Sequence, residues 1–102
     1  MKVYNKLVRD RIPEILAEKK IQYNFHIADN KEYLEMLYKK VLEELEEFKK
    51  DPSIQEFADL MEVLENIARI YKFDVKEIKT VKKAKKISRG GFDNMIILET
   101  TD

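Results

Sequence analysis

The sequence predicts a mainly α-helical protein, an antiparallel helical bundle that is completed by oligomerisation. Three observations favour this fold class. Apolar residues recur every three to four positions along two long segments, near 31–50 and 53–72. Only two Gly and two Pro interrupt the chain, so helix breaks are few. The second long segment is apolar over so much of its surface that it needs neighbours on more than one side.

Length and composition limit the choice of protein class. A chain of 102 residues predicts one domain over 1–102, with a small core. Its 20 basic and 20 acidic residues leave no net charge to attract nucleic acid. No run approaches the ~18 apolar residues of a membrane span, and MKVYNKLVRDRIPEI lacks the apolar core of a signal peptide. We therefore expect a cytoplasmic protein that binds neither nucleic acid nor membranes.

The N-terminal third contains one short helix and one candidate strand. Pro13 suits the first turn of a helix over PEILAEKK. The segment QYNFHIAD, residues 22–29, partly alternates and favours a strand, with Tyr23, Phe25 and Ile27 on one side. His26 would point the other way, and we interpret it as a surface or hydrogen-bonded histidine.

The central part predicts two long helices joined by a short turn. Asp29 or Asn30 caps the first helix, and Asp51 or Ser53 caps the second, which runs to about Lys72. The short turn predicts antiparallel neighbours. The apolar stripe of the first helix consists of Leu34, Leu37, Tyr38, Val41, Leu42, Leu45 and Phe48.

The C-terminal part predicts a lysine-rich helix from about Asp74 to Ile87, which stops at Gly90-Gly91. MIILET, residues 95–100, then favours a terminal strand. An antiparallel pairing with the 22–29 segment would give a short terminal β-hairpin.

Acidic residues lie on both sides of the central turn. At about 100° per residue, Glu44 lies closest to the edge of the apolar stripe, with Glu47 one turn along, and Glu43 falls on the opposite, wet side. On the second helix Glu56 falls within the broad apolar sector, and Asp59 lies on its border. The exposed face of that helix carries Glu62, Glu65 and Arg69.

A carboxylate in an apolar environment is costly unless it is compensated. Mg²⁺ binds carboxylate oxygens, waters and substrate phosphates. Two acidic pairs at i and i+3 on antiparallel helices can converge on such ions. For the run of acids at 43–47 alone, a solvated surface with Glu–Lys pairs such as Glu46 with Lys50 is the simpler interpretation. The positions of Glu56 and Asp59 favour the metal.

Three motifs carry a resemblance to a known family. EELEE followed by EFAD is similar to the EExxE…ExxD signature of the MazG-like, all-α nucleoside triphosphate pyrophosphohydrolases. The ends, YNKLVRDRIPEIL and KKISRGGFDNMIIL, resemble a small subfamily described as phosphoribosyl-ATP pyrophosphohydrolase-like. The resemblance thus covers nearly the whole chain. Only eight residues separate Glu47 from Glu56, fewer than is typical of the family, which leaves less chain to shape a base pocket.

The resemblance implies a helical dimer or tetramer that binds Mg²⁺, or alternatively Mn²⁺. It also implies hydrolysis of a nucleoside triphosphate to the monophosphate and pyrophosphate. Carried over residue by residue, the implied metal ligands are Glu44, Glu47, Glu56 and Asp59.

The implied chemistry needs a proton acceptor and cations for the phosphates. Glu47 is our choice for the catalytic base that takes a proton from the attacking water. Asn66, on the Asp59 side of its helix, could touch sugar or base, or equally bind backbone. The candidate phosphate ligands are Lys6, Arg9, Lys82, Lys83, Lys86 and Arg89. For Lys82 and Lys83 a solvated basic face is an equal alternative.

Other functions remain open on the sequence. The chain could be a non-enzymatic, oligomeric interaction module whose acids pair with its lysines. A nucleic-acid binder using the basic helix at 76–89 is disfavoured by zero net charge and few nearby aromatic residues. Phosphoribosyl-ATP hydrolysis is a third possibility, although no residue identifies a phosphoribosyl site.

Overall fold

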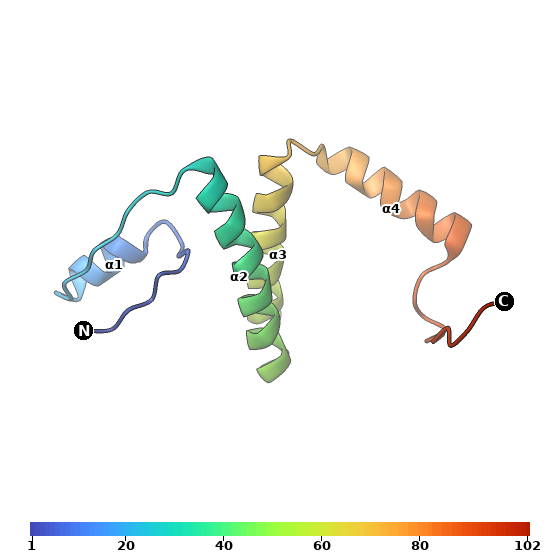
Figure 1. The fold of residues 1–102 in the computed structure, drawn as a ribbon, viewed down its shortest axis with the longest axis horizontal. Coiled ribbons are helices and arrows are strands. Elements are labelled where there is room, and N and C mark those ends of the chain that lie inside the picture. The colour runs from blue at the N-terminus through green and yellow to red at the C-terminus, as the bar shows by residue number, and fades with distance from the viewer. The chain divides into compact units, whose positions relative to one another are not determined.

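The computed structural model describes all of residues 1–102, and its regular secondary structure is entirely α-helical (Figure 1). The four helices are α1 (Ile12–Glu18), α2 (Asn30–Lys50), α3 (Ile54–Ile70) and α4 (Val75–Arg89). The chain divides into two compact units, 1–71 and 72–102. The predicted helical class and all four predicted helices are therefore confirmed, while the oligomeric bundle stays a prediction.

Helices α2 and α3 pack against each other as an antiparallel pair (Figure 1). Asp29 caps α2, because its side chain accepts a hydrogen bond from the backbone N–H of Glu32 at 2.8 Å. Ser53 caps α3 in the same way, by accepting from the backbone N–H of Glu56 at 3.2 Å. Only Asp51, Pro52 and Ser53 separate the two helices, so the acids that flank this turn are brought close together.

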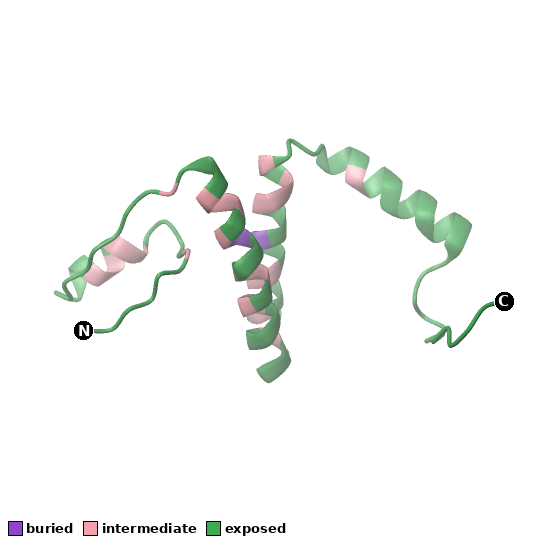
Figure 2. Cartoon of the chain, viewed as in Figure 1, coloured by how far each residue is buried: buried purple, intermediate pink, exposed green.

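The core of the helix pair is small. Leu37 of α2 is 2% exposed and Val63 of α3 is 7% exposed, and they are the two buried residues (Figure 2). Much of the remaining apolar surface of the pair is open, at Tyr38, Leu42, Leu45, Ile54, Phe57, Met61 and Leu64. The expected wide apolar face of α3 is thus present, and within one chain it stays largely uncovered.

The N-terminal segment, residues 1–11, has no regular helix but is tied to the helix pair by two ion pairs. Lys6 Nζ lies 3.0 Å from Glu43 Oε1 on α2, and Arg9 Nη2 lies 2.8 Å from Asp59 Oδ1 on α3. Helix α1 follows directly, with Pro13 in its first turn as predicted. The segment therefore crosses both helices close to the acidic residues.

No residue of the chain is in a β-strand. Residues 22–29, where alternation favoured a strand, are irregular and mostly exposed, and residues 95–100 have no regular structure either. A strand needs a partner for its backbone N–H and C=O groups. The pairing of these segments as a hairpin stays a prediction. His26 is hydrogen-bonded as interpreted, with Nε2 3.0 Å from the Glu32 carboxylate.

The second unit consists of α4 and an irregular C-terminal segment. The Asp74 side chain caps α4 by accepting from the backbone N–H of Lys76 at 3.2 Å. The helix ends at Gly90, whose φ of 83° is a left-handed conformation that glycine adopts without a Cβ clash. None of its residues is buried. No helix of either unit is long and apolar enough to span a bilayer.

Candidate metal centre

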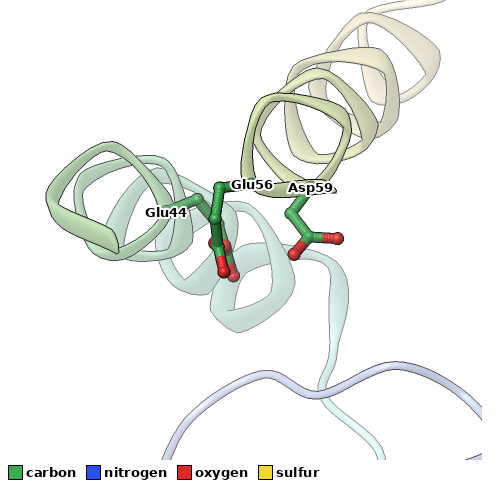
Figure 3. A group of neighbouring side chains, drawn as sticks. All are labelled: Glu44, Glu56 and Asp59. Carbon is green, nitrogen blue, oxygen red and sulfur yellow. The ribbon is translucent and has the colours of Figure 1, made fainter. Parts of the chain in front are cut away.

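Three carboxylates from two helices converge next to the α2–α3 turn. One oxygen each from Glu44, Glu56 and Asp59 lies within 4.8 Å of the others. Figure 3 shows the Glu44 side chain reaching from α2 and the other two from α3, with their carboxylates turned to the same space. All three residues are partly buried. Such a set of hard oxygen donors fits Mg²⁺ or Mn²⁺, which bind carboxylates and keep several waters.

The charge on this group is only partly compensated. Partial desolvation raises the pKa of Glu56, and the nearby charges of Asp59, Glu44 and Glu47 raise it further. The Glu44 side chain is 12% exposed, compared with 38% for Asp59, and it has Lys40 Nζ at 3.5 Å. Three acids this close repel one another, and a divalent cation would relieve that repulsion.

Glu47 lies outside the group of three. It is exposed on α2, one turn beyond Glu44, although its charge still contributes to the raised pKa of Glu56. The structure therefore brings together three of the four carboxylates predicted as ligands. The predicted roles of Glu47, as fourth ligand and as base, stay predictions.

Glu43 corrects one part of the helical-wheel interpretation. The wheel places it on the wet side, but its side chain is only 32% exposed, and Lys6 of the N-terminal segment lies against it. Lys6 and Lys40 both donate hydrogen bonds to Glu43 Oε1, at 3.0 and 3.3 Å. Partial burial acts to raise the pKa of Glu43, but the hydrogen bonds and positive charges of Lys6 and Lys40 together outweigh it and lower the pKa. A helical wheel of α2 alone contains no information on a segment more than 30 residues away.

A hollow of about 400 Å³ lies beside the carboxylates, within the first unit. Glu44 and Asp59 are among its lining residues, and Leu37 and Val63 contribute apolar lining. Its other polar and charged lining residues are Arg9, Asp10, Tyr33, Lys40, Glu62, Asn66 and Arg69. The volume lies in the range of small-molecule sites.

Two predicted substrate ligands line this hollow, and a third lies close by. Arg9 and Asn66 are in the lining, and Lys6 is bound to Glu43. The Asn66 amide donates to the backbone carbonyl of Glu62 at 2.8 Å, which is the backbone alternative considered for it. Lys40 and Arg69 were missed as candidates, and so was Tyr33. Arg69 is exposed as expected, but the exposed face that it shares with Glu62 borders the hollow.

The remaining predicted phosphate ligands belong to the second unit. Lys82, Lys83, Lys86 and Arg89 are exposed residues of α4. Lys82 lines a second, largely apolar hollow of about 430 Å³ formed within that unit, together with Phe73, Ile78 and Val81. Their roles toward phosphate stay predictions.

Comparisons with protein-family models, with curated proteins and with solved structures found no match to this chain.

Proposed function

We propose that the protein is a Mg²⁺-dependent nucleoside triphosphate pyrophosphohydrolase, with Mn²⁺ as an alternative metal. The convergence of the Glu44, Glu56 and Asp59 carboxylates beside a hollow of about 400 Å³ carries this proposal. An acidic group alone is common on protein surfaces, but here it adjoins a cavity that also contains Arg9, Lys40 and Arg69. The carboxylates would then bind the metal ion, and the cations would bind the phosphates of the same substrate.

In this reaction water adds to the α-phosphorus, and the bond between that phosphorus and the oxygen bridging to the β-phosphate breaks. The nucleoside monophosphate and pyrophosphate are the products. A bound divalent cation supplies charge neutralisation and lowers the pKa of water. Glu44, Glu56 and Asp59 would hold it, with Glu47 as the further predicted ligand. Glu47 is exposed at the edge of the group, where it can pass a proton taken from the water to solvent.

The chain's own cations would orient the phosphates. Arg9 presents a planar guanidinium that suits phosphate oxygens, and Lys40 and Arg69 line the same hollow. Tyr33 and Asn66 are the uncharged polar residues of the lining, and they would contact the sugar or base. In this proposal Lys6 adds positive charge for the leaving pyrophosphate, whereas the same role of Lys82, Lys83, Lys86 and Arg89 in the second unit stays a prediction from the sequence.

The proposal includes a homo-oligomer, a dimer or tetramer. Only two residues of the chain are buried, whereas a stable helical bundle encloses a continuous core. A second copy placed against Leu42, Phe57 and Met61 would cover the open apolar face of the helix pair. Sedimentation at micromolar concentration tests this part, and a monomer there would contradict it.

The Glu56→Gln substitution tests the metal site and the activity together. It keeps the size of the side chain and removes one negative charge. We expect pyrophosphate release to fall by about 100-fold or more, since even groups that only support metal ligands contribute about 10–100-fold. Wild-type protein should gain about 2.7 kcal/mol of stability at a Mg²⁺ concentration of about 100 times Kd, and the variant much less.

The measurement is a screen of common and damaged nucleoside triphosphates, in which pyrophosphate and phosphate are quantified separately. Glu46→Gln is the matched control, because Glu46 is 61% exposed and pairs only with Lys49 on its own helix. Glu43 is unsuitable, since two lysines bind it. Equal Mg²⁺ stabilisation of wild type and Glu56→Gln, with no pyrophosphate from any nucleotide, would falsify the proposal.

Two alternatives are separated by the same measurements. A non-enzymatic interaction module is favoured by the ion pairs that already bind two of the acids, Arg9 with Asp59 and Lys40 with Glu44. It predicts no selective effect of Mg²⁺ or Mn²⁺ on stability. Phosphoribosyl-ATP hydrolysis uses the same bond cleavage, and including that nucleotide in the screen distinguishes it.

A further inference from the structure

The carboxylate of Asp59 belongs both to an ion pair with Arg9 and to the carboxylate group that is proposed to bind a metal ion. Arg9 Nη2 donates to Asp59 Oδ1 at 2.8 Å, from a residue 50 positions earlier in the chain. An oxygen of the same carboxylate belongs to the group of three that lies within 4.8 Å. A guanidinium on Asp59 and a divalent cation beside it repel each other, since both are positive and would share one carboxylate.

The charges around the hollow show why this competition matters. Its lining carries three cations, Arg9, Lys40 and Arg69, and four acids, Asp10, Glu44, Asp59 and Glu62, a sum of −1. Adding Glu56 of the carboxylate group makes the sum −2. A triphosphate is not attracted to a negative cavity. One divalent cation bound to the carboxylate group brings the sum to zero. Because it occupies the Asp59 carboxylate, it also takes away the ion-pair partner of the Arg9 side chain.

The segment that carries Arg9 is held independently of this side chain. Lys6, three residues earlier, binds Glu43 at 3.0 Å. The Arg9 backbone carbonyl accepts from the N–H of Ile12 at 3.1 Å, where α1 begins. The Arg9 side chain is 63% exposed, and Arg9 lines the hollow. It can therefore leave Asp59 by rotating its own side chain, while the backbone stays in place.

We propose that Arg9 and a divalent cation exchange at Asp59, so that metal binding transfers Arg9 from Asp59 to the phosphates of the substrate. This inference rests on the proposed function. In the metal-free protein Arg9 neutralises part of the acidic group. In the metal-bound protein it becomes a phosphate ligand with its planar fork available. Metal then precedes nucleotide in the order of binding.

The competition between Arg9 and the cation at Asp59 is tested by titrating the protein with Mn²⁺ alone. Electron paramagnetic resonance measures the free ion. In Arg9→Gln, Mn²⁺ affinity should rise by about two- to fivefold, because a competing ion pair of the exposed kind is lost. The transfer of Arg9 to the phosphates is tested with Mn²⁺-loaded protein and an α,β-methylene triphosphate nucleotide, measured by calorimetry. There Arg9→Gln should weaken binding by about tenfold or more.

Arg11→Gln is the control, because Arg11 pairs only with Glu14 on the surface of α1. It should change neither affinity. If Arg9→Gln leaves Mn²⁺ affinity unchanged or weaker while Glu56→Gln abolishes it, the exchange is wrong and the proposed metal site stands. Unchanged nucleotide affinity in Mn²⁺-loaded Arg9→Gln also overturns the exchange. If wild-type protein binds no Mn²⁺, both proposals fail.

Discussion

The two units of the chain differ in what stabilises them. Residues 1–71 have 12 basic and 15 acidic residues, a net charge of −3, and residues 72–102 have 8 basic and 5 acidic residues, a net charge of +3. The first unit contains both buried residues and all seven ion pairs. The second contains a capped helix without a buried residue. Local sequence is enough to specify a helix, whereas the candidate site needs contacts between distant residues.

Truncation of one apolar side chain in each unit gives the largest expected effect. Leu37→Ala should lower the free energy of unfolding by about 2–5 kcal/mol, since Leu37 is 2% exposed in the helix pair. Ile87→Ala, at a side chain that is 77% exposed on α4, should change it by less than about 0.5 kcal/mol. Urea denaturation at low protein concentration measures both.

If both variants lost the same free energy of unfolding, the Ile87 side chain would be buried in solution as Leu37 is. If the loss for Ile87→Ala appears only as protein concentration rises, a second copy provides the cover, because association stabilises the folded state by mass action.

A smaller effect is expected from the acids of the first unit in the absence of metal. The pKa of Glu56 is raised above 4.5, first by desolvation and then by the charges of Asp59 and Glu44. The folded state therefore holds this proton more tightly than the unfolded state, and stability falls as pH rises from 4.5 through the raised pKa. Glu56→Gln should raise the apo Tm at pH 7, and the gain should disappear below pH 4.5. A gain independent of pH would contradict this origin.

Glu43 should show the opposite sign and the smallest effect. Its pKa is lowered below 4.5, because the hydrogen bonds and charges of Lys6 and Lys40 together outweigh its partial burial. Its stabilisation is present above pH 4.5 and is lost as pH falls through the lowered pKa. Glu43→Gln should therefore cost up to ~1 kcal/mol at pH 7, and hydrogen exchange should become faster in residues 1–11. If stability depended on pH in the same way in Glu43→Gln and Glu56→Gln, the opposite pKa shifts of the two acids would be contradicted.

The helices were predictable because their signals are local. The i, i+3, i+4 stripe that includes Leu37, the cap at Ser53 and the stop at Gly90 each act within one turn of the helix. The convergence of Glu44 with Glu56 and Asp59 followed from the same local information, because the turn between the helices is short.

What the residues did not reveal was the path of the N-terminal segment. Nothing in the sequence indicated that Arg9 binds Asp59, and Glu43 was expected in water but binds Lys6. Lys40 and Arg69 resembled ordinary surface charges, since nothing in the periodicity of α2 or α3 indicates the hollow between them and residues 7–10. Contacts across 37 to 50 positions leave no periodic pattern in a single sequence.

The turn at Asp51-Pro52-Ser53 has a consequence for how the length of this protein can change. The Ser53 hydroxyl accepts a hydrogen bond from the backbone N–H of Glu56. The residue that caps α3 therefore also fixes the direction in which the Glu56 side chain leaves the helix. One inserted residue before the cap would displace α3 along its partner, and one inserted after the cap would turn Glu56 by about 100° away from Glu44. Insertions are expected to be tolerated in the irregular 19–29 and 90–102 segments. These three residues act as a spacer of fixed length, because a change in that length would separate the carboxylates of the acidic group.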